Sequence, residues 1–167
     1  MKQIIPILAL FFLFYFYSNR EQILIPDYAI RFRVIANSSS EEDQELKMKV
    51  KEEVEEKLNR LMVNARTSQE AKIILQEELP HIQNLVEKYT KESEISLGMN
   101  YFPEKEYHGV VYPSGNYDSL VITLGHGLGN NWWCVMYPPL CFLENKTETE
   151  EVEYRFLVKD LLEKYTS

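Results

Sequence analysis

The sequence predicts an α+β domain whose mixed, mostly antiparallel sheet is covered on one face by two or three helices. Three observations predict this class: alternating apolar residues at 30–36, helical periodicity after them, and a return to alternation from residue 95 onward. The 167 residues suffice for one such domain, because compact domains usually contain about 100–200 residues. We expect a signal peptide or short membrane anchor at 1–20, a tether at 21–29 and a single α+β domain at 30–167.

The N-terminal region contains an uncharged hydrophobic segment, residues 4–17, preceded by Lys2. A helix needs about 20 residues to span a bilayer, so this segment has the length of a signal-peptide hydrophobic region instead. No small-residue cleavage site follows it, which leaves an uncleaved short anchor as the alternative. A buried terminal helix is a further alternative, which Pro6 and the lack of a polar face disfavour. We therefore expect an exported chain whose membrane contact is confined to residues 4–17.

The first predicted strand and helix follow the tether. Apolar and basic side chains alternate over residues 30–36, which predicts a strand with one buried face. Ser38 and Ser39 each have a glutamate three residues later, as in a capping box, which predicts the start of a helix. The apolar positions of this amphipathic helix are Leu46, Val50, Val54, Leu58 and Leu61.

The rest of the chain predicts further helices and then strands. Thr67 with Glu70 signals a second helix, and Pro80 favours the first turn of a third helix with a break or kink before it. Strands are expected at 95–101, 119–124, 132–137 and 152–158, followed by a helical turn at 160–165. The strand–helix–strand order predicts one parallel pair, whereas hairpins predict antiparallel pairs elsewhere.

Charge and motif spacing disfavour several classes of function. The formal net charge is −8, and an acidic protein is repelled by phosphate backbones. Gly125, Gly127 and Gly129 occupy every second position, which does not match the dinucleotide-binding pattern, and no Walker lysine follows them. The three histidines lack zinc-site spacing. We expect no nucleic-acid partner, no cofactor, no metal site and no small-molecule substrate.

Two cysteines, Cys134 and Cys141, lie seven positions apart with two prolines between them. In an exported chain an even number of cysteines favours a disulfide. Two buried free thiols are the alternative. A cysteine hydrolase with Cys134 as nucleophile, His126 as base and Asp118 as the orienting acid can also be drawn, although nothing in the spacing requires it.

Both tryptophans, Trp132 and Trp133, are adjacent on a predicted strand. Neighbouring side chains on a strand point to opposite faces, so one ring can enter the core while the other meets a helix, a partner or water. An exposed tryptophan is a frequent interface anchor. Burial of both rings between sheet and helices is the alternative.

The opening block of the folded part consists of Ile30–Ser38, the acidic residues after it and the lysine-rich helix. This block resembles the stage II sporulation protein R family of endospore-forming bacteria, and the second half of the chain extends the resemblance. It continues in Tyr112–Tyr117, in Gly127-x-Gly129-x-Asn131-Trp132-Trp133-Cys134-Val135 and in Pro138-Pro139-Leu140-Cys141-Phe142. Rare residues make up the last two blocks, and the resemblance covers the chain from about Ile30 to Phe142.

The resemblance implies a signalling protein without catalytic residues. It would be exported from the forespore into the space between the forespore and mother-cell membranes. There it would activate a membrane-embedded aspartic protease of the mother cell, stage II sporulation protein GA, which processes the precursor of sigma factor E. The alternatives are an extracytoplasmic cysteine hydrolase and an envelope-binding module. The residues that the resemblance places at the partner-binding surface are Arg31, Arg33, Asn37, Ser38, Asn131, Trp132, Trp133, Pro138 and Pro139.

Overall fold

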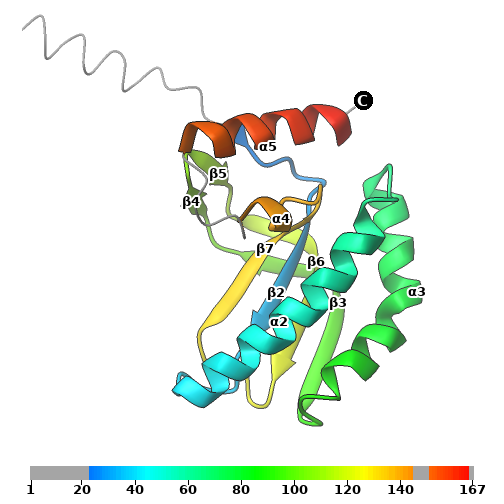
Figure 1. Ribbon diagram of the computed structural model, residues 1–167, viewed down its shortest axis with the longest axis vertical. Coiled ribbons are helices and arrows are strands. Elements are labelled where there is room, and N and C mark those ends of the chain that lie inside the picture. Colours follow the sequence, from blue (N-terminus) through cyan, green and yellow to red (C-terminus); the bar gives the residue numbers. More distant parts are fainter. Residues whose placement is uncertain (1–22, 145–150, 166–167) are drawn as a thin grey trace, which may run out of the picture.

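A computed structural model describes residues 23–144 and 151–165 of the chain. The described part is an α+β structure with a four-stranded and a three-stranded sheet, which confirms the predicted fold class (Figure 1). The predicted signal peptide or anchor at 1–20 lies outside the described residues. Within 23–144 and 151–165, no helix is both long and apolar enough to cross a membrane.

The larger sheet has the strand order β3-β6-β2-β7. Strand β2 is parallel to β6 and antiparallel to β7, and β3 is antiparallel to β6. The sheet is therefore mixed, and its parallel pair is the one expected from the strand–helix–strand order. The predicted strands at 30–36, 95–101, 119–124 and 132–137 correspond to β2 (Ile30–Ile35), β3 (Ser93–Phe102), β6 (Gly115–Leu124) and β7 (Asn131–Tyr137).

Helices α2 (Glu41–Met62) and α3 (Ser68–Val86) lie together on one face of this sheet (Figure 1). Alternate residues of β2, β6 and β7 point toward them, because side chains alternate between the faces of a strand. The first core lies between these two layers. Its members include Val50, Val54, Leu58 and Met62 of α2, Ala71, Leu75, Ile82 and Val86 of α3, and Phe32, Val34, Leu120, Ile122 and Cys134 of the sheet.

The ends of these helices partly correct the sequence analysis. Helix α2 starts one or two residues later than the capping-box pattern at Ser38 and Ser39 suggested, because Ser40 is the cap and its hydroxyl accepts the backbone N–H of Asp43 at 3.3 Å. Thr67 caps α3 as predicted and accepts the N–H of Glu70 at 3.1 Å. The predicted break before Pro80 is wrong, since α3 continues through it. Burial of α3 residues on both sides of Pro80 offsets the local cost of the proline.

A second core lies beside one end of the larger sheet. The smaller sheet has the order β1-β5-β4, formed by Ile23–Leu24, Val110–Tyr112 and Lys105–Tyr107. Strand β1 falls within the range expected to be a tether, and Ile25 and Ala29 after it are buried. Helices α4 (Cys141–Glu144) and α5 (Glu151–Tyr165) complete this end. The buried residues here include Phe102, Val110, Tyr112, Tyr117, Trp133, Val135, Leu140, Tyr154 and Val158.

The predicted strand at 152–158 is wrong, because these residues belong to α5. The alternation predicted that Tyr154, Phe156 and Val158 share one face. In the structure Tyr154 and Val158 are buried, whereas Phe156 is 74% exposed. Tyr154 and Val158 are four residues apart, which is also the spacing of one helix face. The helical turn expected at 160–165 is the last part of the same helix.

Different elements form the two ends of the described domain. Strand β1 and α5 lie at one end, whereas the β2–α2 turn and the β6–β7 loop lie at the opposite end (Figure 1). We refer to residues 36–43 and 125–131 together as the loop end. The described chain thus begins, at Ile23, far from the loop end.

We expect Leu58→Ala to lower the free energy of unfolding by about 2–5 kcal/mol, because it removes a buried side chain from the first core. Met48→Ala is the matched control on the same helix, since Met48 is 37% exposed, and it should change stability by about 0.5 kcal/mol or less. Urea unfolding of the two variants measures both values. Equal losses for Leu58 and Met48 would contradict the assigned inner face of α2.

Candidate functional site

The predicted partner-binding residues fall into two groups in the structure. Arg31, Trp133, Pro138 and Pro139 are buried, whereas Arg33, Asn37, Ser38, Asn131 and Trp132 retain exposed surface. Asn37, Ser38 and Asn131 gather at the loop end. Partner binding by this set stays a prediction, and the exposed members are those that can contact another molecule directly.

Arg31 is fully buried among aromatic rings of the second core. Its guanidinium carbon lies 3.6 Å from the ring centroid of Tyr117, 4.9 Å from Trp133 and 5.1 Å from Phe102. Nη2 donates a hydrogen bond to the carbonyl of Pro113 at 2.9 Å, while Nε and Nη1 have no hydrogen-bond partner. Burial lowers the pKa of Arg31 below its ordinary value. Ring faces therefore supply much of the electrostatic compensation for this cation.

Arg33 lies on the same side of β2 as Arg31, two residues further along. Its Nη2 donates to the carbonyl of Tyr101 at 2.9 Å, and its guanidinium carbon lies 3.9 Å from the ring centroid of Phe102. Partial burial lowers the pKa of Arg33. The two arginines thus contact the same phenyl ring. The two arginines alternate with apolar residues of β2 because they pack on the sheet face opposite helices α2 and α3.

The two tryptophan rings lie on opposite sheet faces, as their adjacency predicted. Trp132 packs edge-to-face on Phe32, with centroids 5.8 Å apart, and Lys51 Nζ lies 4.5 Å from its ring centroid. Trp133 lies 5.8 Å from Tyr112 by ring centroids and is 8% exposed. Trp133 belongs to the second core, whereas Trp132 packs against the first. The alternative that both rings are buried between sheet and helices is wrong, because Trp133 is buried on the face opposite α2 and α3 and Trp132 is only partly buried.

Cys134 and Cys141 form a disulfide that joins β7 to the start of α4. Their Cα atoms are 5.4 Å apart, within the range that a disulfide requires. Pro138 and Pro139 form the turn between them, and the Tyr137–Pro138 peptide bond is cis. The prolines and cysteines of the Asn131–Cys141 block therefore hold the end of β7 in the interior.

A buried ion pair lies next to the disulfide. Lys51 and Glu55 of α2 interact at 2.6 Å, with side-chain exposures of 5% and 4%. A carboxylate oxygen of Glu55 and the two sulfurs lie within 4.8 Å of one another, and all three residues are buried. Zinc ligation needs thiolates, whereas these sulfurs are bonded to each other. With the disulfide formed, Glu55 is the one residue of this cluster that can offer a ligand to a cation.

The residues drawn for a cysteine hydrolase have other partners in the structure. The sulfur of Cys134 is in the disulfide, so it is not available as a thiolate nucleophile. Asp118 forms an ion pair with Lys72 of α3. His126 lies in the β6–β7 loop, where its backbone N–H donates to the side chain of Asn37.

The loop end is organised by Asn37 and Ser38. Asn37 Nδ2 donates to Asp43 Oδ2 at 3.0 Å, and Ser38 Oγ donates to the same oxygen at 2.6 Å. The Asn37 side-chain oxygen accepts the backbone N–H of His126 at 2.9 Å. The hydrogen bond from Ser38, followed by the one from Asn37, holds the pKa of Asp43 below its ordinary value. These bonds connect the end of β2, the first turn of α2 and the β6–β7 loop.

Two glycines allow the β6–β7 loop to lie against this network. Gly125 has a φ of +55°, which L side chains rarely adopt. A Cβ at Gly129 would collide with the carbonyl oxygen of Ser38. The backbone N–H groups of Leu128 and Gly129 donate to the carbonyls of Asn37 and Ala36 at 3.0 and 2.9 Å. The glycines thus serve close backbone packing at the loop end.

Leu128 projects from this loop with 81% of its surface exposed. The sequence analysis did not single it out, since one leucine between two glycines carries no periodicity. The sequence indicates Leu128 only by the contrast between its apolar side chain and the two adjacent glycines, which shape the backbone. Exposed His126 and Asn130 lie in the same loop, and exposed Asn131 begins β7.

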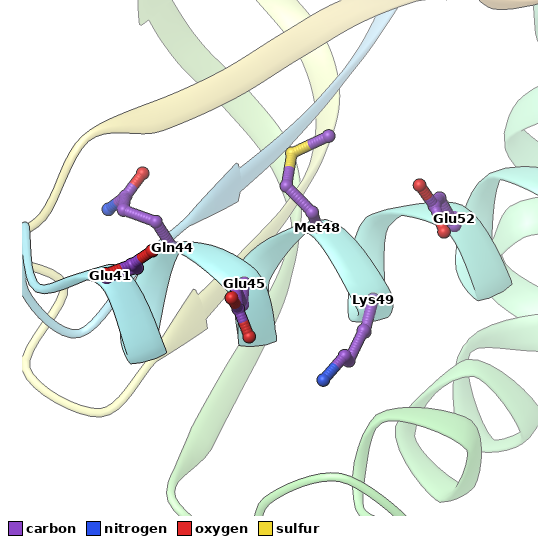
Figure 2. Close-up of a pocket in the computed structure, with 6 residues that line it drawn as sticks. All are labelled: Glu41, Gln44, Glu45, Met48, Lys49 and Glu52. Carbon is purple, nitrogen blue, oxygen red and sulfur yellow. The ribbon is translucent and has the colours of Figure 1, made fainter.

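The outer face of α2 carries a surface depression lined by Glu41, Gln44, Glu45, Met48, Lys49 and Glu52 (Figure 2). All six residues come from this helix alone. A ligand there would contact one helix and remain open to solvent, whereas ligand sites usually enclose most of a ligand's surface. We therefore assign no binding role to this depression.

Comparison with known proteins decides the family. The family model for stage II sporulation protein R matches residues 26–147. The chain belongs to this family. It is also 39% identical over 133 residues to the stage II sporulation protein R of Bacillus subtilis (strain 168), covering 76% of this chain and 59% of that protein. The chain thus spans about three fifths of its relative's length. No solved structure matches it.

Membership in the stage II sporulation protein R family confirms the resemblance that the sequence blocks indicated. The matched region includes the larger sheet, α2, α3, the disulfide and the whole loop end, but not α5. The sequence blocks that carry the family resemblance and the loop end therefore lie in the same matched part of the fold.

We expect the double variant Cys134→Ala with Cys141→Ala to lose about 2–3 kcal/mol of unfolding free energy, because the disulfide closes a short loop in the unfolded chain. Urea unfolding without reductant measures this loss. As a control, the wild-type protein denatured without reductant should show no reactive thiol, and two after reduction. Free thiols before reduction would contradict the assigned disulfide.

Asp43 should make stability depend on acid pH. Its folded pKa is lowered, so its stabilising effect is complete above the unfolded pKa of about 3.9 and is lost as the pH falls through the lower folded pKa. The stability difference between wild type and Asp43→Asn should therefore shrink on acidification from about pH 7 to about pH 3. Urea unfolding across this range measures it, with Glu42→Gln as the control for removing one charge from the same helical turn. A difference that does not depend on pH would contradict the network.

Proposed function

We propose that this protein is an exported signal that activates stage II sporulation protein GA, the membrane-embedded aspartic protease of the mother cell, to process the precursor of sigma factor E. It would act in the space between the forespore and mother-cell membranes. Residues 4–17 would direct export or provide its membrane contact. Activation would require that the protein binds the active arrangement of the protease more tightly than the inactive one.

The family match over residues 26–147 carries this proposal. A disulfide also supports it, because disulfides persist mainly outside the reducing cytosol. A protein that acts by contact needs a folded surface more than a catalytic constellation. The loop end offers such a surface, held by side chains from three segments of the chain.

The two alternatives make different demands on the molecule. A cysteine hydrolase needs a reactive thiolate, and Cys134 is bonded to Cys141. An envelope-binding module needs only retention on cell-wall material. Such a module predicts binding of the full chain to purified cell wall without an effect on proteolysis.

We expect the processed fraction of the sigma factor E precursor to rise when the full chain is co-expressed with the protease. Deleting residues 1–18 should abolish signalling across the membrane, because the chain would stay in the compartment that made it. Immunoblots of precursor and product measure the effect, with cells lacking the protease as the control. Equal processing with and without this protein would refute the proposed function.

A further inference from the structure

We propose that the tip of the β6–β7 loop is the part of this protein that contacts the protease, with Leu128 inserting into an apolar pocket of its extracytoplasmic part. This inference rests on the proposed function and names the contact surface. Leu128 is 81% exposed, the largest exposed fraction among the large apolar residues in the described ranges. A single exposed apolar residue needs no explanation by itself. Leu128 stands out because hydrogen bonds to the rest of the domain hold the backbone of its loop.

The loop holds Leu128 in place before any partner binds. The Leu128 N–H donates to the Asn37 carbonyl at 3.0 Å, and the next N–H donates to Ala36 at 2.9 Å. Lys47 Nζ donates to the carbonyl of Asn130 at 3.3 Å. These bonds fix the backbone on both sides of an unpacked side chain. A loop backbone that is already ordered loses less conformational entropy on binding, so this pre-organisation increases affinity.

The position of the tip fits a partner on the facing membrane. The described chain begins at Ile23 beside α5, and the β6–β7 loop lies at the opposite end of the domain (Figure 1). If the membrane of origin is contacted only through residues 4–17, the tip is the part of the domain that can extend furthest from it. The proposed protease belongs to the opposite membrane.

The charges around the tip favour a protein pocket over a lipid surface. The first turn of α2, which is connected to the loop through Asn37, contains Glu41, Glu42 and Asp43. Anionic lipid headgroups would repel these carboxylates. A protein pocket with an apolar centre and a basic rim would complement both the leucine and the acids.

Co-expression of the full chain with the protease and the sigma factor E precursor tests this inference. Leu128→Ala and Leu128→Glu should raise the amount of protein needed for half-maximal processing by about tenfold or more, as expected for an interface anchor. Phe156→Ala and Phe156→Glu are the matched controls, because Phe156 is 74% exposed on α5 at the other end of the domain. These controls should match wild type. Thermal unfolding should be unchanged in all four variants, because both side chains are exposed.

A photo-crosslinking experiment identifies the occupant directly. Leu128→benzoylphenylalanine in the full chain should give a light-dependent adduct with the protease, and Phe156→benzoylphenylalanine should not. Wild-type activity of Leu128→Glu, or crosslinking from position 128 only to lipid, would overturn the inference while leaving the proposed function intact. Failure of the wild-type protein to raise processing would instead refute the proposed function, and the contact site with it.

Discussion

The position of β2 between β6 and β7 determines both halves of the molecule. Phe32 and Val34 face the helices and enter the first core, whereas Arg31 and Arg33 face the opposite side. The register with β7 places Arg33 beside Trp133 and Val34 beside Trp132. A slip of one residue would exchange the two faces and put both guanidinium groups under the helices. The pairing of this one strand therefore specifies which side chains form each core.

The same strand also positions the loop end. In the bend just after β2, Asn37 and Ser38 hydrogen-bond to the first turn of α2, and Asn37 also binds the β6–β7 loop. Because β6 and β7 are both paired with β2, the loop that joins them begins and ends beside Ile35, the last residue of β2. Sheet register and loop position are therefore fixed by the same backbone pairing. Asn37 and Ser38 contribute by binding the Asp43 carboxylate, and Asn37 also binds the backbone N–H of His126.

Much of the larger sheet and the first core could be predicted from the sequence, because one-sided burial gives β2 and α2 clear periodicity. The second core gave no such signal. Strands β1, β4 and β5 contain only two or three residues each, and α5 combines helical spacing with a misleading alternation. Of the site, the signature residues were recognised, but their burial was not. Arg31 is enclosed by rings from β3, β6 and β7, and only the tertiary fold brings these together.

Helix α5 has a practical consequence for the choice of expression boundaries. The family match ends at residue 147, before this helix begins. Yet the hydroxyl groups of Tyr154 and Tyr112 share a hydrogen bond of 2.7 Å, and Val158 is fully buried in the second core. A fragment trimmed to the family match would uncover apolar surface and leave the Tyr112 hydroxyl without this partner. Recombinant versions should therefore extend through Tyr165.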